Sequence, residues 1–506
     1  MKRLGIDSIE AIFEFKTADG SAAGILRLSP AAHQGGAMRA WLLSTTLESL
    51  DGHEEKIGAN RPTGAAYSRN FGGDNWADVR RKASAYADRE PTVLVVGGAQ
   101  AGLSIAARLN QVGVDTLVVE QWPRIGDSWR KRYHSLALHN SIHLNHLPYM
   151  EFPPTWPKYI PKDMLGLWFE FYAEVMEINC WTDTEFVEGT WNETAQRWTA
   201  RLKRGDGTER VVRPRHLVFA NGVSSYPMIP DAPGLQDFKG EVIHSEGFDS
   251  GADWTGKRAF ILGTGSSAND IALDLHSHGV HTTLIQRGST TVVSIDPSAR
   301  LNEAIWDEGG PLEDCDLIVS AATPPLIVKA YKSVVKRMVE LDKDMIEGLK
   351  RIGFKHDIGE DETGHQMKYF RRGGGYNLDA GSSALMIKGE IGLLQFEPQC
   401  FVRNLVKEYH ILHCGKASSL IGGPNNPKLN DPICSGLAIV GGDYFGQSIK
   451  IAQPPPGSQA EKVGATDNGA RDGAKHINVD ANGRHDEPLR RKILLPKIEL
   501  APSHEY

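Results

Sequence analysis

The sequence has few cysteines, no long apolar run and no excess of basic residues. Five cysteines among 506 residues form no C-x-x-C pair, so neither a disulfide framework nor a cysteine-rich zinc site is indicated. No run approaches the roughly 20 apolar residues of a membrane helix, and Asp7, Glu10 and Glu14 interrupt any apolar core of a signal peptide. A net charge of −7 gives no basic surface for nucleic acid. We therefore expect a cytoplasmic protein without nucleic-acid or integral-membrane partners.

Buried strands and a helix alternate from Pro91 onward. Val93–Val96 is an all-apolar run, typical of a parallel strand buried on both faces, and a helical stretch over 102–111 and a strand over Thr116–Glu120 follow it. A second unit of this kind runs from Ala259 to Gln286. Two strand–helix–strand units predict an α/β protein with two Rossmann-like domains.

The turn after the first strand is a glycine-rich loop. Gly97 and Gly102 fill the first and third positions of a G-x-G-x-x-G pattern, with Ala99 in the second. Small residues allow a tight turn, close packing of the helix and approach of the backbone to a pyrophosphate. Glu120, 18 positions after Gly102, is placed to accept hydrogen bonds from ribose hydroxyls. An ordinary glycine-rich turn is the alternative. The residues predicted to bind this nucleotide are Gly97, Ala99, Gln100, Ala101, Gly102, Glu120 and Gln121.

The second unit has a similar loop without the acid. Gly263 and Gly265 begin a G-x-G-x-x-A pattern, and the following strand ends at Arg287 instead of a carboxylate. A guanidinium binds a 2′-phosphate that a carboxylate would repel, so this site is predicted to prefer NADPH to NADH. Arg287 could also be a solvated surface arginine. Ser266 and Ser267 could bind phosphates or merely cap the helix.

Two dinucleotide sites in one chain indicate that one holds a flavin and the other delivers hydride to it. We predict a FAD-binding domain over 91–250 and an NADP-binding domain over 251–390 inserted in it. A β-meander is expected within 186–220 and helix over 325–350. The remaining boundaries are a partial β-rich, cone-like segment over 1–58, a linker over 59–90, a segment over 391–452 that is a candidate for completing the FAD domain, and a polar, disordered tail over 453–506.

A motif between the two loops resembles the identifying sequence of a known family. Phe238, Gly240, His244 and Phe248 fit F-x-G-x-x-x-H-x-x-x-[FY], which is found in flavin-containing and N-hydroxylating monooxygenases. The stretch from Gly126 to Trp129 is similar to the family's flavin-lining G-[GD]-x-W. Asn221-Gly222 with Pro227, Pro230 and Pro233-Gly234 resembles its A-T-G-x-x-x-x-P-x-x-P-G segment, with Asn in place of Thr. The chain most resembles the branch of the plant indole-3-pyruvate monooxygenases and their bacterial and fungal relatives.

The resemblance implies a reaction and a catalytic residue. Family members use FAD, NADPH and O2, form a C4a-hydroperoxyflavin, and insert one oxygen atom into a small organic substrate. It implies that Gly126, Trp129, His139 and Ala220 contact the cofactor and that Asn140 stabilises the oxygenated flavin, although Asn140 could also be an ordinary loop residue. Nitrogen, sulfur and α-keto-acid centres are all open as targets, as is N,N-dimethylaniline monooxygenase activity. A homodimer is compatible with the sequence.

Some parts of the chain depart from the family. The sequence after about residue 396 does not resemble the closing strand and C-terminal segment of the family. The alternative function is therefore a degenerate flavoprotein that is inactive, or uncoupled with NADPH oxidase activity. A disulfide-reductase-like flavoenzyme needs a redox-active cysteine pair, which the sequence lacks. His134, His139, His143 and His146 cluster in the sequence, but their spacing alone predicts no metal site.

Overall fold

The computed structural model describes residues 2–3, 6–30, 37–64, 67, 69–222, 227, 229, 235, 238 and 240–395, together with the backbone of 410–413, 450–452 and 462–464. Among the described helices, none combines the length and apolar character that a membrane span requires. The predicted α/β class with two Rossmann-like units is confirmed, since two five-stranded sheets rich in parallel pairs carry the two glycine loops.

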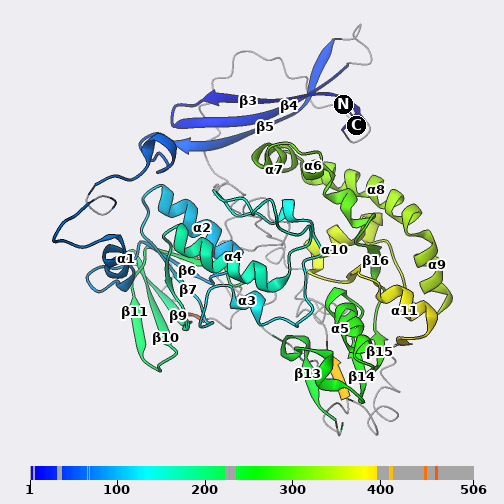
Figure 1. Ribbon diagram of the computed structural model, residues 1–506. Helices are drawn as coiled ribbons and strands as arrows, with labels where there is room; N and C mark the ends of the chain where they lie inside the picture. The colour runs from blue at the N-terminus through cyan, green and yellow to red at the C-terminus, as the bar shows by residue number, and fades with distance from the viewer. Residues whose placement is uncertain are drawn as a thin grey trace.

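The N-terminal segment, predicted to be β-rich, is an antiparallel meander. Its antiparallel sheet has the order β3 (Ile9–Lys16), β4 (Gly20–Pro30), β5 (Met38–Leu50), and a short hairpin of β1 (Lys2–Arg3) and β2 (Ile6–Asp7) precedes it. The three long strands lie at one end of the molecule beside α6 (Ala304–Asp307) and α7 (Leu312–Ser320) (Figure 1).

A buried arginine of this sheet, paired with a glutamate of the neighbouring strand, joins the sheet to α7 through a hydrogen bond. Arg27 Nε lies 2.6 Å from Glu10 Oε2, and Arg27 Nη2 donates to the carbonyl oxygen of Ile318 at 3.2 Å. Ile25 and Leu42 pack beside it against Ala321. One face of the meander is therefore covered by the helical part of the chain.

The segment predicted as a linker contains a helix, α1 (Trp76–Ala85), besides the 3-10 turn η1 (Gly58–Asn60). Asn75 caps α1 in a capping box with Asp78, a start signal that was present in the sequence. The helix packs on the first sheet, where Trp181 Nε1 donates to the carbonyl oxygen of Ser84 at 2.7 Å.

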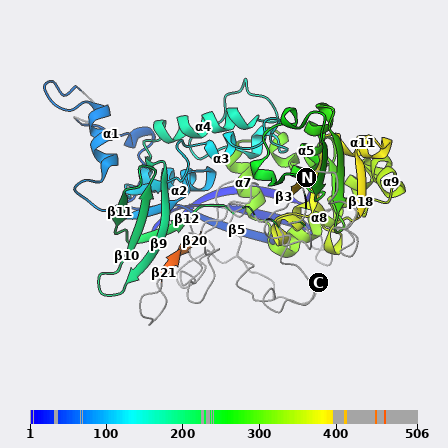
Figure 2. The ribbon, with the colours of Figure 1, turned by 90° about the horizontal axis from the view of Figure 1, so that it is seen from below.

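The first sheet is sandwiched between helices and a second β-layer. Successive side chains of its central strands point to opposite faces of the sheet. Val95 and Val118 pack in the core on the helical side, whereas Leu94 and Leu117 pack in the core beside the β-meander. Such division is expected for central strands buried on both faces, and Figure 2 shows the two layers from below. The strand order of the first sheet is β20 (Lys450–Ala452), β12 (His216–Phe219), β6 (Val93–Val96), β7 (Thr116–Val119), β8 (Asn179–Trp181). The helices are α2 (Gln100–Gln111), α3 (Asp127–Arg130) and α4 (Lys162–Val175), and the 3-10 turn η3 (Ile142–Leu144) lies between α3 and α4 in the chain. The meander consists of β9 (Thr184–Asn192), β10 (Arg197–Arg204) and β11 (Glu209–Val212).

The second sheet lies between β12 and β20 in the chain, so its domain is an insertion in the first. All its strand pairs are parallel, in the order β13 (Val242–His244), β19 (His410–His413), β14 (Arg258–Leu262), β15 (His281–Gln286), β18 (Gly392–Gln395). Three helices pack around this sheet: α5 (Ser266–Ser277), α9 (Lys343–Arg351) and α11 (Ser382–Lys388). The domain also contains a parallel pair of strands, β16 (Thr291–Ser294) and β17 (Tyr376–Asp379), and the helices α8 (Pro324–Leu341) and α10 (Gly364–Arg372). Its 3-10 turns are η5 (Ser245–Gly247), η6 (Gly251–Trp254), η7 (Ala299–Asn302) and η8 (Glu360–Glu362).

Two expectations need refinement. The helix expected over 325–350 is two helices, which meet at the buried Asp342, whose φ of −96° and ψ of 14° depart from helical values. Its carboxylate accepts hydrogen bonds from the backbone nitrogen and the hydroxyl of Ser294 at 3.0 and 2.7 Å. The segment 391–452 is shared: β19 enters the second sheet, whereas β20 pairs antiparallel with β12 at the edge of the first. The predicted disordered tail lies outside the described residues except for β21 (Lys462–Gly464), which pairs with β9.

Candidate functional site: two nucleotide loops and the segment between them

The first glycine loop is a tight turn from β6 into α2. Gly97 has a φ of +108°, and a Cβ on it would lie 2.5 Å from the carbonyl oxygen of Ala220. A Cβ on Gly102 would lie 1.8 Å from the carbonyl oxygen of Gly97. Both glycines are therefore required by close backbone approach. Ala99 is the N-cap of α2 without a side-chain cap, and Ala101 is buried in the first turn.

The orientation of Glu120 is fixed by the backbone. Its Oε2 accepts from the backbone nitrogen of Gly98 at 2.8 Å and its Oε1 from that of Trp122 at 3.0 Å. Burial raises the pKa of Glu120, although these hydrogen bonds and that of Gln121 oppose the increase. Each carboxyl oxygen keeps a further lone pair for a ribose hydroxyl. Gln121 itself is exposed.

The segment from Gly126 to Trp129 lies next to the loop. Gly126 has a φ of +88°, and a Cβ on it would lie 2.1 Å from the carbonyl oxygen of Gly166 in α4. Trp129 Nε1 donates to Oε1 of Gln100 at 3.3 Å, which joins two residues that the sequence predicted separately as cofactor contacts.

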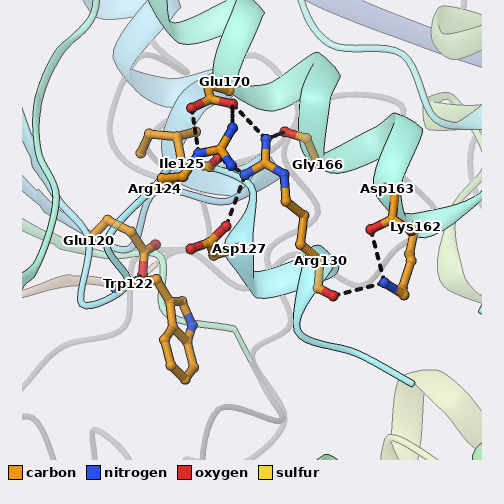
Figure 3. Close-up of polar contacts among 10 residues, drawn as sticks. All are labelled: Glu120, Trp122, Arg124, Ile125, Asp127, Arg130, Lys162, Asp163, Gly166 and Glu170. Atoms are coloured by element: carbon orange, nitrogen blue, oxygen red, sulfur yellow. Dashed lines mark hydrogen bonds and ion pairs between the residues drawn. The ribbon is translucent and has the colours of Figure 1, made fainter. Parts of the chain in front are cut away.

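An arginine that sequence reasoning missed supports this segment. Arg130 donates to Asp127 at 3.0 Å and to Glu170 and the carbonyl oxygen of Gly166 at 2.7 and 2.8 Å. Arg124 also binds Glu170, through two hydrogen bonds of 2.7 and 3.0 Å. Figure 3 shows both guanidinium groups directed at Glu170. Because α3 and α4 are far apart in sequence, spacing alone gave no signal for this network.

The second loop has the same backbone form as the first. Gly263 has a φ of +136° and donates from its nitrogen to the carbonyl oxygen of Ile285 at 3.0 Å. Gly265 is the N-cap of α5. Ser266 Oγ accepts from the backbone nitrogen of Leu378 at 3.2 Å, so this hydroxyl fastens α5 to β17, a use that sequence reasoning did not consider.

Ser267 and Arg287 lie on, or directly after, elements next to the second loop. Ser267 is in the first turn of α5, and Arg287 is exposed directly after β15. In parallel sheets the ends of neighbouring strands lie at the same edge, so the position of Arg287 suits a nucleotide bound at this loop. The preference for NADPH stays a prediction.

The loop from Leu138 to Ile142, called the Asn140 loop below, connects the two domains. His139 Nε2 lies 3.0 Å from Asp270 Oδ2 on α5, and the backbone nitrogen of Ser141 donates to Oε2 of Glu303 at 3.1 Å. Burial lowers the pKa of His139, but the hydrogen bond and the charge of Asp270 raise it by more. Asn140 is half-buried, and its role stays a prediction.

The motif between the loops is described in part. Phe238 is buried, and Phe248 packs in the core of the second domain together with Tyr133 from the first. His244 ends β13, and its Nδ1 accepts from the backbone nitrogen of Glu246 at 3.2 Å. Gly240 precedes β13. Pro230, Pro233 and Gly234 lie outside the described residues.

The histidines of the first domain do not converge. His146 Nε2 lies 3.3 Å from Asp316 Oδ2, whereas His139 contacts Asp270. Within the part of the chain that the structure describes, no group of three or more histidine, cysteine, aspartate or glutamate side chains is arranged to hold a metal ion.

The fold and these loops define a class of protein in which two dinucleotide-binding domains are carried on one chain. The sequence model of the pyridine nucleotide-disulphide oxidoreductase family matches residues 91–308, which include both loops. The cysteine pair that a disulfide reductase requires is absent from the sequence.

Known relatives are flavin monooxygenases. Indole-3-pyruvate monooxygenase YUCCA1 of Oryza sativa subsp. japonica is 32% identical over 204 residues, covering 40% of this chain and 49% of that protein. Probable indole-3-pyruvate monooxygenase YUCCA9 of Arabidopsis thaliana is 34% identical over 202 residues, covering 40% and 48%. A solved structure of a mutant flavin monooxygenase from Stenotrophomonas maltophilia has 16% identity and a TM-score of 0.42, covering 64% of this chain and 78% of that chain.

The chain spans about half the length of these plant relatives. The resemblance to flavin-dependent monooxygenases that the motifs predicted is confirmed for the matched part of the chain.

Proposed function

We propose that this chain is a FAD- and NADPH-dependent monooxygenase acting on a small organic substrate. The observation that carries the proposal is the pair of glycine loops, each at the carboxyl end of a parallel strand in its own sheet, with the Asn140 loop hydrogen-bonded to the helix that follows the second loop. Ligands of open α/β sheets bind at this edge. The matched relatives bear the name of indole-3-pyruvate monooxygenases, which supports an oxygenation reaction.

The residues present fit both nucleotides. Gly97 and Gly102 allow the tight turn into α2, and a pyrophosphate would bind at the N-terminus of this helix. The carboxylate of Glu120 is held by two backbone N–H groups. At the second loop, Gly263 and Arg287 correspond in chain position to Gly97 and Glu120, and we assign them to NADPH. The bound flavin would carry out the chemistry with O2, whereas the protein would orient the two cofactors and keep water away from them.

The Asn140 loop lies between the two domains, and we assign a role in catalysis to its central residue. The Asn140 side chain would donate a hydrogen bond towards the flavin where the flavin reacts with O2. The substrate would be a nitrogen, sulfur or α-keto-acid compound, and we include N,N-dimethylaniline among the test substrates. A cytoplasmic location and a homodimer complete the proposal, and cell fractionation and light scattering test them.

The direct test is to purify the chain and measure bound flavin. We expect stoichiometric FAD whose absorbance NADPH bleaches under nitrogen. Gly97→Val places a branched side chain where even a Cβ would lie 2.5 Å from the carbonyl oxygen of Ala220, so this variant should be isolated without flavin. Stoichiometric FAD in Gly97→Val would contradict the assignment of the first loop.

The second measurement separates a coupled monooxygenase from an uncoupled NADPH oxidase. The alternative rests on the residues after 396, whose sequence does not resemble the family's closing segment. Product and hydrogen peroxide are measured per NADPH consumed, with each substrate class in turn. Product close to stoichiometric supports the monooxygenase, whereas peroxide alone supports the oxidase.

A further inference from the structure

The five residues from Leu138 to Ile142 are held alternately by the two domains. The backbone nitrogens of Leu138 and Ile142 donate to the carbonyl oxygens of Ile160 and Lys158, at 2.9 and 2.8 Å, within the first domain. Between them, His139 and Ser141 bind carboxylates from the second domain (Asp270 and Glu303). The residue at the centre is Asn140.

Asp270 links this loop to the second nucleotide site. It lies in the second turn of α5, whose N-cap is Gly265 of the second glycine loop. Its Oδ2 is 3.0 Å from His139 Nε2 and accepts from the hydroxyl of Tyr133 at 2.6 Å. Both partners belong to the first domain, so one carboxyl oxygen joins α5 to two places on the other domain.

Glu303 holds the other side of Asn140. It lies between η7 and α6 and is 5% exposed. Its Oε2 accepts from the backbone nitrogen of Ser141 at 3.1 Å. This hydrogen bond fixes the position of the Ser141 backbone, because breaking it would leave a buried carboxylate and a backbone N–H group without partners, which is unfavourable in free energy.

We propose that Asp270 and Glu303 are positioning residues that place Asn140 according to the state of the second domain, so that NADP binding at the second loop orders the Asn140 loop. This rests on the proposed function. A nucleotide that orders the start of α5 also fixes Asp270, and through it His139. Coupling of this kind is reciprocal and typically worth about 5- to 150-fold in affinity.

The test is hydrogen exchange of the Ser141 amide, with and without NADP⁺, in the purified FAD-containing protein. Fragmentation mass spectrometry isolates this amide. In the unaltered protein we expect NADP⁺ to slow its exchange at least fivefold. Asp270→Asn should abolish most of this NADP⁺ effect, and Glu303→Gln should speed exchange with and without the nucleotide. A general loss of stability would not remove the NADP⁺ dependence selectively.

Asp316→Asn is the matched control. Asp316 also contacts a histidine of the first domain, at 3.3 Å, but this residue, His146, lies outside the Asn140 loop and six positions from Asn140. It should retain the exchange behaviour of the unaltered protein. The two test variants should also raise the peroxide released per NADPH, while the control should not. If one test variant does not fold, the other decides alone.

The outcomes separate the two proposals. If the unaltered protein binds neither FAD nor NADP⁺, the proposed function fails. If it binds both and Asp270→Asn and Glu303→Gln exchange like Asp316→Asn, the positioning role is overturned while the function stands.

Discussion

The replacement of Gly97 by alanine tests how the first nucleotide loop is built. Gly97 has a φ of +108°, and backbone of this kind costs about 1–3 kcal/mol for a residue with a side chain. The new Cβ would lie 2.5 Å from the carbonyl oxygen of Ala220. That residue cannot easily move, because its nitrogen donates to the carbonyl oxygen of Val96 at 2.8 Å. Overpacking adds about 1–3 kcal/mol, so the loss totals about 2–6 kcal/mol.

Gly113→Ala is the matched control for backbone strain. Gly113 follows the other end of α2 and has a φ of +81°, but the nearest atom to an added Cβ is Lys56 Nζ at 3.9 Å. Only the strain of about 1–2 kcal/mol should remain. Urea denaturation gives both unfolding free energies, and absorbance gives the FAD content. Gly97→Ala should lose more stability and release flavin, whereas Gly113→Ala should retain it. Equal losses in the two variants would refute the reasoning.

Three further results are expected. Arg287→Ala should raise the apparent Kd for NADPH about ten- to a hundredfold, from a charge-assisted contact of roughly 1.5–3 kcal/mol, and equal weakening of NADH would contradict the assigned role. Glu10→Ala should cost about 3–5 kcal/mol in urea denaturation, because it leaves Arg27 buried and unpaired, whereas the exposed Glu340→Ala should cost under about 1 kcal/mol. Burial lowers the pKa of His365 to about 4, below its unfolded value of about 6.5. The neutral side chain should therefore contribute stability above pH 6.5 that is lost as the pH falls towards 4, by about 3 kcal/mol. Urea midpoints of the protein and of His365→Gln over this range check it, and parallel profiles would contradict it.

The helical and β patterns of the sequence determined most of the secondary structure near the nucleotide loops. Val93–Val96 is apolar at every position because both faces of β6 are buried, and Gly97 and Gly263 were identifiable because only glycine suits their backbone angles. The helix α1 was missed although Asn75 and Asp78 form a capping box, since the polar composition around it masked this short signal.

By itself, therefore, the sequence determined the two β–loop–α units, the acid at Glu120 and its absence at Arg287, because each depends on residues close together in the chain. Only the tertiary structure decided which distant groups meet. Nothing in the spacing of His139 and Asp270 predicts their contact at 3.0 Å, and the same holds for Ser141 and Glu303. Such contacts depend on how one domain packs against the other, and local periodicity carries no information about that packing.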